Sequence, residues 1–368
     1  MKYYIISGEA SGDLHASNLA KQLFLADPKA QIRAWGGDLL RKTGATVVKD
    51  YKDLAFMGFV EVALHLKKIL KNLSFCKKDI LDFLPDVVIL VDYPGFNLRL
   101  AKFLHTKKIK VFYYISPQVW AWKKSRVKII KQYVDEMFVI LPFEQDFYKK
   151  YDIHVHYFGH PLLDVVRQYP IQTTNFKQTN QLDNRPIIAI LPGSRKQEIL
   201  RMLPTMLKIT KYFTEYQFVI AGIENHKNLY INSQGIKVVY NQTYNLLASS
   251  YAALVTSGTA TLETALFNVP QVVCYKGNFF SYLIAKHLIS GIKYISLVNL
   301  IADDNVVTEL IQKEMNVDCV KKELEKILPD NQYRNQMLKA YQNLHQQLGD
   351  GFASKYIAEK IIELLKIN

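Results

Sequence analysis

Short apolar segments alternate with segments of helical spacing along most of the chain, in two runs that a polar stretch separates. In the first run this pattern predicts strands at 3–7, 32–35, 46–48, 87–91, 111–115 and 137–140 and helices at 14–24 and 60–72. In the second run it predicts strands at 187–191, 218–221, 237–239, 253–255 and 271–275 and helices at 197–213, 244–249, 261–267 and 353–365.

The predicted strands are continuously apolar, which is typical of a parallel sheet that helices cover on both faces. The fold class is therefore α/β, with two doubly wound, Rossmann-like domains. The polar stretch, rich in Thr, Asn and Gln, predicts a linker. We expect the following division: an N-terminal domain at 1–167, a linker at 168–185, a C-terminal domain at 186–345, and a C-terminal helix at 346–368 that could pack back on the first domain. Ligands of such folds bind at the carboxyl ends of the strands, so we expect a site in a cleft between two sheets.

Composition narrows the class of protein. With 368 residues, 49% of them hydrophobic and 22% charged, the chain has the profile of a globular protein of about two domains. Its three cysteines, Cys76, Cys274 and Cys319, are far apart, which excludes a disulfide framework and a CxxC metal or redox motif. The sequence predicts neither a bilayer-spanning segment nor a signal peptide, so we expect a cytoplasmic protein.

The chain is basic, with 47 Lys and Arg against 33 Asp and Glu, a net charge of +14. Residues 93–134 contain no acidic residue. Three explanations of this positive charge remain open: solvated helix faces, an anionic membrane surface and an acidic ligand. Nucleic-acid binding is the weakest explanation, since no nucleic-acid-binding motif accompanies the charge. One stripe at helical spacing with flanking lysines fits either a core helix or an interfacial helix on anionic lipid. Its members are Phe59, Val62, Leu66, Lys67, Lys68, Ile69, Leu70 and Lys71.

Candidate chemistry in the first half lies in the loops after strands. The first loop holds Gly8, Glu9, Ser11 and Gly12, and small residues there let a sugar approach the backbone at a helix start. It is neither a dinucleotide fingerprint nor a Walker loop. An NAD site, with Asp38 as its ribose acid, therefore stays a weak alternative, and a plain turn with Asp13 as helix cap stays open.

Two further loops follow in the first half. Asp92 ends an apolar strand, where Pro94 and Gly95 stop it, and its carboxylate is either a site residue at the sheet edge or a turn former. Trp120, beside Lys123 and Lys124, suits contact with a sugar or an acyl chain, or packs in the core.

Two loops in the second half resemble anion sites. Gly193, Ser194 and Arg195 lie between a strand and a long helix, a pattern that favours an anion at the helix start. A second strand–helix loop offers hydroxyls and N–H groups to a diphosphate and a carboxylate to ribose, although Thr-x-x-Glu is also a capping box. Its residues are Ser257, Gly258, Thr259, Thr261 and Glu263.

Seven motifs, in the same order, resemble those of lipid-A-disaccharide synthases over nearly the whole chain. They are GEASGD at 8–13, FMG followed by EV at 56–62, DYPGFN at 92–97, SPQVWAW at 116–122, FGHPL at 158–162, LPGSR at 191–195 and SGTATLE at 257–263. The resemblance implies a GT-B fold and an inverting glycosyl transfer with no cofactor and no obligatory metal. It implies UDP-2,3-diacylglucosamine as donor, 2,3-diacylglucosamine 1-phosphate as acceptor, and lipid A disaccharide phosphate and UDP as products.

The resemblance also implies roles for single residues. Asp92 matches the family's candidate general base, Arg195 its diphosphate arginine, and Glu263 lies in its UDP loop. Residues Asn299, Glu309 and Gln312 match a donor region, in which the chain departs from the family at Val298, Asp304, Asn305 and Thr308. His15 is a rival base, since several GT-B enzymes place a catalytic histidine at the first helix.

The family's acylated substrates imply peripheral association with the inner membrane, and a homodimer stays open. The alternatives are another UDP-sugar GT-B enzyme, such as a UDP-N-acetylglucosamine epimerase or the lipid II transferase, and a basic module that binds membrane or nucleic acid.

Overall fold

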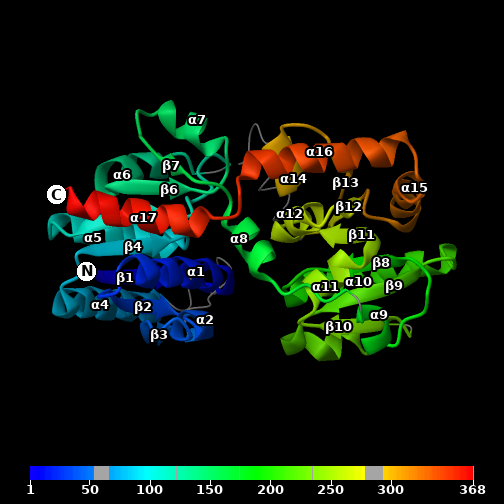
Figure 1. Cartoon of the computed structure of the whole chain (residues 1–368), viewed down its shortest axis with the longest axis horizontal. Helices are drawn as coiled ribbons and strands as arrows, with labels where there is room; N and C mark the ends of the chain where they lie inside the picture. The colour runs from blue at the N-terminus through cyan, green and yellow to red at the C-terminus, as the bar shows by residue number, and fades with distance from the viewer. Residues whose placement is uncertain (54–65, 122, 174, 234, 278–292, 368) are drawn as a thin grey trace. The chain divides into compact units, whose positions relative to one another are not determined.

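The computed structural model describes residues 1–53, 66–121, 123–173, 175–233, 235–277 and 293–367. Within it the chain forms two compact units (Figure 1). The first unit is Met1–Asp164 with Leu348–Asn368, and the second is Val165–Gln347. The chain therefore leaves the first unit once and returns to it once.

The first unit contains a parallel sheet of seven strands in the order β3-β2-β1-β4-β5-β6-β7. The strands are β1 Lys2–Ser7, β2 Gln31–Gly36, β3 Thr46–Asp50, β4 Val87–Val91, β5 Lys110–Tyr114, β6 Glu136–Val139 and β7 His156–Tyr157. All five residues of β4 are buried, because helices cover both faces of the sheet and no strand face needs polar residues.

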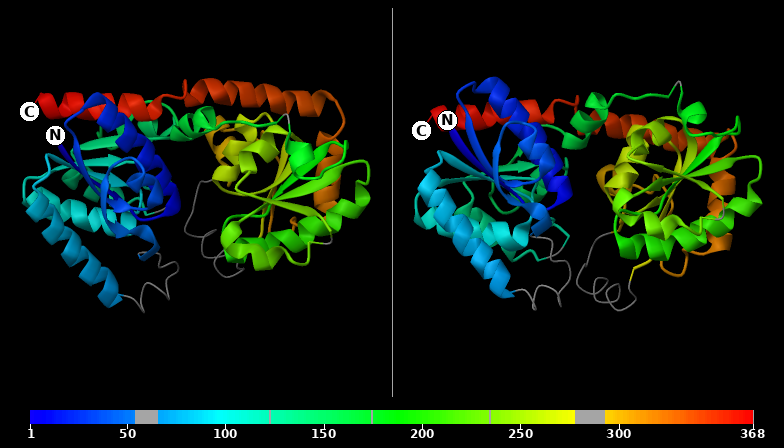
Figure 2. Two further views of the ribbon diagram at one scale, coloured as in Figure 1. Left: turned by 60° about the horizontal axis from the view of Figure 1, so that its bottom comes forward. Right: turned by 90° about the horizontal axis from the view of Figure 1, so that it is seen from below.

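Helices cover both faces of this sheet, and each face has its own hydrophobic core. The helices of the first unit are α1 Ala10–Ala26, α2 Asp38–Arg41, α4 Leu66–Phe83, α5 Pro94–Thr106, α6 Arg126–Tyr133, α7 Glu144–Lys149 and α17 Ala353–Lys366, with a 3₁₀ turn η1 at Tyr51–Asp53 and α8 Pro161–Gln168 leading into the second unit. One core packs α4, α5 and α6 on the sheet, and the other packs α1 and α17 on its opposite face (Figures 1 and 2). In the second core Ile357 and Ile361 of α17 are fully buried.

The second unit contains a parallel sheet of six strands in the order β10-β9-β8-β11-β12-β13. The strands are β8 Ile187–Leu191, β9 Gln217–Gly222, β10 Lys237–Tyr240, β11 Ser250–Thr256, β12 Gln271–Tyr275 and β13 Glu309–Ile311. The helices are α9 Phe176–Thr179, α10 Lys196–Ile209, α11 Thr243–Ala248, α12 Thr259–Leu266, α14 Leu297–Ala302, α15 Val317–Ile327 and α16 Gln332–Leu348, with 3₁₀ turns η2 Thr210–Tyr212 and η3 Glu224–Tyr230. The prediction of two α/β domains with doubly wound parallel sheets is confirmed.

Three expectations about single elements differ from the structure. The stretch 168–185 was expected to be a linker, but Phe176 in α9 is 3% exposed and belongs to the core of the second unit. Of the helix expected at 60–72, residues 60–65 lie outside the described residues, and from Leu66 the helix runs on to Phe83, because Cys76 and Ile80 extend its buried face. Helix α5 was not predicted, although its start at Pro94 matches the preference of proline for a first helical turn.

No helix among the described residues combines the length and the apolar character that crossing a bilayer requires. In the expected membrane stripe, Phe59 and Val62 lie outside the described residues and Leu66 begins α4. Of the remaining members, Lys67, Lys68, Leu70 and Lys71 are exposed and Ile69 is half-buried. The described part of α4 therefore presents lysines to solvent together with Leu70, Phe75 and Leu81.

Candidate active site

The glycine-rich loop after β1 packs against the loop after β4. Gly8 and Glu9 join β1 to α1, and a Cβ atom on Gly8 would overlap the ring of Tyr93. A Cβ on Gly12 would lie 3.1 Å from the Cβ of Ser7, so this turn of α1 also passes close to the strand end. Gly8 and Gly12 are buried, Glu9 is half-buried and Ser11 is exposed. Glycine is thus required here for close approach between two loops at the carboxyl edge of the sheet.

Asp92 lies in a strained turn that its neighbours hold in place. Its φ is +45° and that of Tyr93 is +48°, a left-handed conformation that non-glycine residues rarely adopt. The carbonyl oxygen of Asp92 accepts hydrogen bonds from Tyr113 Oη at 2.6 Å and from Asn97 Nδ2 at 2.7 Å. The Asp92 N–H donates to the carbonyl oxygen of Tyr114 at 3.0 Å. Tyr113 and Asn97 thus hold the backbone of this turn, a role that the sequence does not indicate for either residue.

The electrostatic environment makes the Asp92 carboxyl group a stronger base than an ordinary aspartate. Burial, and after it the charge of Glu9, raise its pKa to about 6, although the Tyr93 N–H opposes this shift. A base with a pKa near neutrality is suited to proton transfer at physiological pH. Glu9 and Asp92, predicted separately, are therefore brought together.

His15 and His160 are buried histidines that differ in the hydrogen bonding of their Nδ1 atoms. Burial lowers the pKa of His15 to about 4, and burial followed by the charge of His15 lowers the pKa of His160 to about 3. His15 Nδ1 has no hydrogen-bond partner among the described residues, whereas His160 Nδ1 accepts from the Leu162 N–H at 3.1 Å. Both rings are therefore neutral at pH 7, and His15 is a weaker base than Asp92.

Asp13 and Asp38 connect neighbouring elements of the first unit. Buried Asp13 accepts from the N–H groups of Gly37, Leu39 and Leu40, at 2.6, 3.1 and 3.3 Å, and so caps α2 rather than α1. The exposed Asp38 pairs with Arg41 and Lys52 at 2.8 and 3.0 Å. These surface ion pairs occupy the carboxylate that an NAD site would have needed.

Trp120 packs against a second loop, at 140–143, which a buried carboxyl group holds. Trp120 is half-buried and packs edge-on against Phe143, with ring centroids 5.0 Å apart, and Trp122 lies outside the described residues. Glu144, 1% exposed, accepts from the N–H groups of Ile140 and Leu141 at 3.2 and 3.0 Å. Burial raises the pKa of Glu144 to about 7. Glu144 is a further residue that the sequence analysis missed.

In the second unit, the loop after β8 places Arg195 at the start of α10. Gly193 has a φ of +109°, and a Cβ there would lie 2.6 Å from Glu198 Oε2. Glu198 Oε2 accepts from the N–H groups of Ser194 and Arg195 at 3.0 and 3.2 Å, and Glu198 Oε1 lies 3.3 Å from Arg195 Nη1. Ser194 and Arg195 are exposed. The Glu198 carboxylate thus lies against the N–H groups and the guanidinium that were expected to bind an anion.

The loop after β11 presents an open helix start. Gly258 caps α12 with a φ of +149°, and a Cβ there would meet nothing within 4 Å. Thr259 is exposed, whereas Thr261 is buried and its Oγ1 donates to the Gly258 carbonyl oxygen at 2.8 Å. Ser257 Oγ donates to the carbonyl oxygen of Ile295 at 2.9 Å.

Glu263 forms no capping box, because it lies four residues after Thr259 rather than three, and its side chain bonds to a neighbouring helix instead. Tyr244 Oη, in α11, donates to Glu263 Oε1 at 2.7 Å, and burial raises the pKa of Glu263. The capping-box alternative is therefore wrong. Tyr244 in turn packs edge-on against Tyr169, with ring centroids 5.0 Å apart.

Asn299 and Glu309 use their polar atoms inside the protein. Glu309 accepts from Ser296 N–H at 2.8 Å, from Ser296 Oγ at 2.7 Å and from Ile295 N–H at 2.9 Å. Asn299 Nδ2 also donates to Glu309 at 3.0 Å, and Asn299 Oδ1 accepts from the Val307 N–H at 2.9 Å. These bonds hold the start of α14 against β13.

Gln312 follows β13 with a φ of +55°, and its N–H donates to the carbonyl oxygen of Tyr275 at 2.8 Å. Its buried Nε2 has no hydrogen-bond partner among the described residues. Because Arg195, Ser257 and Gln312 each follow the carboxyl end of a strand in one parallel sheet, they share one edge of the second unit.

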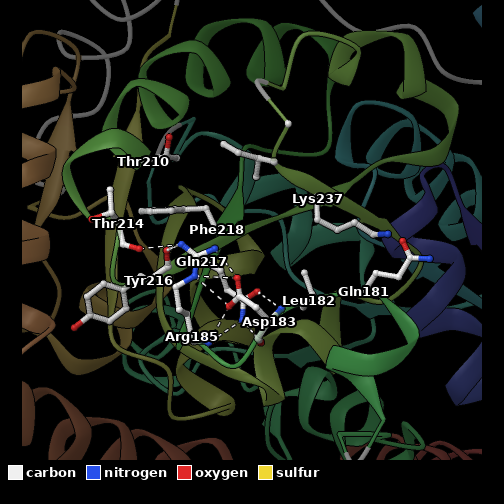
Figure 3. A pocket seen from close by; sticks show the side chains of 12 residues that line it. Gln181, Leu182, Asp183, Arg185, Thr210, Thr214, Tyr216, Gln217, Phe218 and Lys237 are labelled. Carbon is white, nitrogen blue, oxygen red and sulfur yellow. Dashed lines mark hydrogen bonds and ion pairs between the residues drawn. The ribbon is translucent and has the colours of Figure 1, made fainter.

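A cavity of about 330 Å³ lies elsewhere in the second unit, at the amino ends of its strands (Figure 3). Arg185 and Asp183 pair there at 2.6 Å, and Arg185 Nη1 also donates to the carbonyl oxygen of Thr214 at 2.8 Å. Since these groups satisfy one another and lie opposite the carboxyl edge, this cavity is separate from the candidate active site.

Comparison with known proteins identifies the family. A model of the family "Lipid-A-disaccharide synthetase" matches residues 3–361. The lipid-A-disaccharide synthase of Syntrophus aciditrophicus is 39% identical over 98% of this chain and 97% of its own length. That of Coxiella burnetii (strain CbuG_Q212) is 35% identical over 98% of both chains. This chain belongs to the lipid-A-disaccharide synthetase family.

Solved structures support the fold of this family member at much lower sequence identity. The UDP-GlcNAc 2-epimerase from Neisseria meningitidis bound to UDP-GlcNAc has a TM-score of 0.70 at 15% identity, over 99% of this chain and 100% of the other. The S. aureus MnaA-UDP co-structure has a TM-score of 0.72 at 15% identity, over 100% and 97%. The calicheamicin glycosyltransferase CalG4 has a TM-score of 0.60 at 15% identity, over 100% and 98%. These likenesses confirm the expected GT-B fold.

Membership in the lipid-A-disaccharide synthetase family also confirms that the chain is an enzyme, a glycosyltransferase of lipid A biosynthesis. The alternative of a UDP-N-acetylglucosamine epimerase finds no support among the sequence relatives, because those that match nearly the whole chain are lipid-A-disaccharide synthases. The sequence prediction of the family is correct.

Proposed function

We propose that this glycosyltransferase moves 2,3-diacylglucosamine from UDP-2,3-diacylglucosamine to the 6-hydroxyl of 2,3-diacylglucosamine 1-phosphate, with inversion at the anomeric carbon. The products are lipid A disaccharide phosphate and UDP. The observation that carries the proposal is the carboxyl group of Asp92, fixed in a left-handed turn at a sheet edge, with its pKa raised to about 6.

In this proposal Asp92 is the general base. The acceptor alcohol attacks the anomeric carbon on the face opposite UDP, its proton passes to Asp92, and the carbon–oxygen bond to UDP breaks. A single displacement of this kind inverts the configuration. The glycine-rich loop with Gly8, Glu9, Ser11 and Gly12 would hold the acceptor sugar, with Trp120 against its acylated side.

Asp92 is preferred over His15 for two reasons. Its pKa of about 6 makes it the stronger base of the two, since that of His15 is about 4. His15 is also only 8% exposed, which leaves its ring little access to a substrate hydroxyl. We assign His15 a part in packing the first turns of α1.

The donor would bind at the carboxyl edge of the second unit. The open N-terminus of α12 at Gly258, with Ser257 and Thr259, would bind the diphosphate together with Arg195, and would stabilise the charge on departing UDP. Glu263, with Oε1 bound to Tyr244, would accept ribose hydroxyls at Oε2. Arg195 would exchange its carboxylate partner Glu198 for phosphate, since both are anions that bind guanidinium.

Residues Asn299 and Glu309 would act indirectly, because their hydrogen bonds shape the loop at 295–299 beside Ser257. Gln312, with its unpartnered Nε2, would donate to the donor itself.

The test is release of UDP from purified enzyme given both acylated sugars, with each sugar alone as control. We expect UDP only when both are present, and Asp92→Asn to lower kcat by two or more orders of magnitude. UDP release with the donor alone, or conversion of UDP-N-acetylglucosamine to its epimer, would instead favour a different UDP-sugar activity. Loss of turnover in His15→Ala with normal turnover in Asp92→Asn would reverse the assignment of the base.

We also propose that the enzyme works in the cytoplasm at the inner-membrane surface, with the lysines of α4 on anionic headgroups. Support comes from exposed Lys67, Lys68 and Lys71 beside exposed Leu70. In vesicle sedimentation the triple change of these lysines to Gln should weaken binding to anionic vesicles, whereas the same change at Lys321, Lys322 and Lys339 in the second unit should not. Equal binding of the two triple variants would contradict this docking face.

A further inference from the structure

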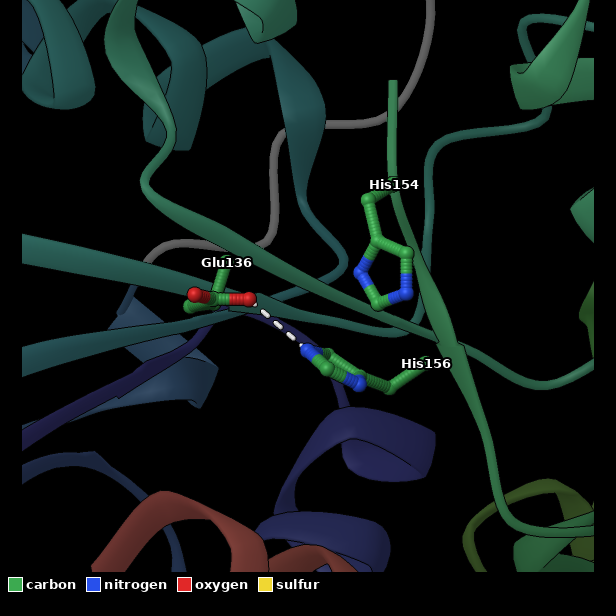
Figure 4. A group of neighbouring side chains, drawn as sticks. All are labelled: Glu136, His154 and His156. Atoms are coloured by element: carbon green, nitrogen blue, oxygen red, sulfur yellow. Dashed lines mark hydrogen bonds and ion pairs between the residues drawn. The ribbon is translucent and has the colours of Figure 1, made fainter. Parts of the chain in front are cut away.

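Three side chains capable of binding a metal ion gather at one end of the first sheet (Figure 4). They are Glu136, which begins β6, His156, which begins β7, and His154, two residues earlier. Their candidate ligand atoms all lie within 4.8 Å of one another, and His156 Nε2 lies 2.7 Å from Glu136 Oε2. The mechanism proposed above uses none of them.

The strand register explains why these side chains meet. Phe138 in β6 pairs with His156 in β7, and side chains two residues apart along extended chain point to the same face. Glu136 therefore lies on the face of Phe138, and His154 on the face of His156. The His156 ring stacks between Phe138 and Phe158, with centroids 5.1 and 6.1 Å away and interplanar angles of 28° and 6°. The imidazole is thus held in a fixed orientation before any ion binds.

The set of donor atoms suits a divalent transition metal. Two imidazole nitrogens and one carboxylate oxygen are a common ligand set for Zn²⁺, with water in the fourth position. Around a tetrahedral Zn²⁺ with bonds of about 2.0–2.1 Å, neighbouring ligand atoms lie about 3.3 Å apart. In the present structure one pair of these atoms is 2.7 Å apart and none is more than 4.8 Å apart, so the three side chains would bind an ion after small side-chain movements. His154 is exposed and lines a surface hollow of about 480 Å³, so an ion would approach the three side chains from the side of His154.

We propose that Glu136, His154 and His156 bind one Zn²⁺-like divalent ion. Glu136 lies at the amino end of β6, whereas Asp92 follows the carboxyl end of β4 in the same parallel sheet, so the ion would take no part in glycosyl transfer. It would instead join β6 to β7, the outermost strand of the first sheet, and stabilise the segment that leads into α8.

Metal titration of the tag-free, full-length chain after treatment with a chelator tests the proposal. Calorimetry with Zn²⁺ at neutral pH should give one ion per chain, and Co²⁺ should give the visible absorption of a tetrahedral site. Variant His154→Ala should weaken binding roughly tenfold or more, and Glu136→Gln likewise. His105→Ala is the matched control, since His105 is exposed in the same unit and belongs to no such cluster among the described residues.

Three results would overturn the proposal: no binding at sub-millimolar metal, unchanged affinity in His154→Ala, or a thiolate charge-transfer band in the Co²⁺ spectrum, which would assign the ion to a cysteine. His154 is the first choice because its ring is exposed and meets His156 only edge-on, with centroids 4.8 Å apart, whereas the His156 ring lies within the aromatic stack. A second readout is the thermal unfolding temperature, which Zn²⁺ should raise in the wild type and in His105→Ala but not in His154→Ala. UDP release should stay at the wild-type level in His154→Ala, which separates this site from the proposed catalytic one.

Discussion

Replacing Asp92 by asparagine should make the first unit more stable while it removes the proposed base. The folded-state pKa of about 6 lies above the usual 3.8, so the folded protein binds this proton more tightly than the unfolded chain does. Ionisation of the carboxyl group therefore costs stability, and this cost appears as the pH rises through 3.8 and is complete above 6. Asparagine has nearly the same shape, tolerates the left-handed turn and carries no charge.

The size of the effect follows from the two pKa values. A difference of about 2 corresponds to about 3 kcal/mol at pH 8, which we reduce to about 1–3 kcal/mol because the Asp92 side chain is partly exposed to water. At pH 5 the wild-type group is largely protonated when folded, so about half of this gain should remain.

Urea unfolding followed by tryptophan fluorescence measures the gain in unfolding free energy of the first unit. All 3 tryptophans, Trp35, Trp120 and Trp122, belong to the first unit, so the signal reports its unfolding. Asp82→Asn is the matched control, because Asp82 is exposed on α4 and its replacement should leave the midpoint unchanged. Two results would show that the pKa of Asp92 is not raised in the folded protein. One is an Asp92→Asn variant no more stable than the wild type at pH 8, and the other is a gain in unfolding free energy that is as large at pH 5 as at pH 8.

Four further changes should have separable effects. In the wild type, kcat/KM should fall about tenfold for each pH unit below a midpoint near pH 6. In Glu9→Gln this midpoint should move to lower pH, because the charge of Glu9 is one cause of the raised pKa of Asp92. An unchanged midpoint in Glu9→Gln would contradict the electrostatic effect of Glu9 on Asp92. Gly8→Ala should destabilise the first unit by about 1–3 kcal/mol through overlap with Tyr93, visible in the same fluorescence assay. Arg195→Ala should abolish turnover and weaken UDP binding but change stability by less than about 1 kcal/mol, because its ion pair with Glu198 is exposed; normal donor kinetics would remove its proposed role. Phe176→Ala should destabilise the second unit by about 3–5 kcal/mol, measured by circular dichroism, whereas a true linker would show no loss.

Much of the fold could be predicted because local patterns determine it. The continuous apolar strand at 87–91 and its counterpart at 187–191 need helices on both faces, and their boundaries agree with β4 and β8. Short edge strands were missed, since β7 has only two residues and β13 three, too few for a pattern. The buried position of Phe176 was missed because one aromatic residue among polar neighbours shows no periodicity.

The candidate site was only partly predictable for a similar reason. Motif positions indicate Asp92, Arg195 and Glu263, but not the partners that fix them. Tyr113 is 21 residues from Asp92 and Tyr244 is 19 from Glu263, and these contacts depend on how the elements pack. Glu198 was more accessible to prediction, since it lies three residues after Arg195 at a helix start, where a carboxylate commonly caps.

The first unit is assembled from two pieces of chain that are far apart in the sequence. Helix α17 fills one of its two cores, where Ile357 and Ile361 pack with α1. During synthesis on the ribosome, some 330 residues are therefore added after α1 before α17 is made, and until then the apolar side of α1 lacks the helix that covers it. The intervening second unit is continuous and can fold first, so the order of folding should run from the middle of the chain outwards, with chaperones most needed by the amino-terminal segment.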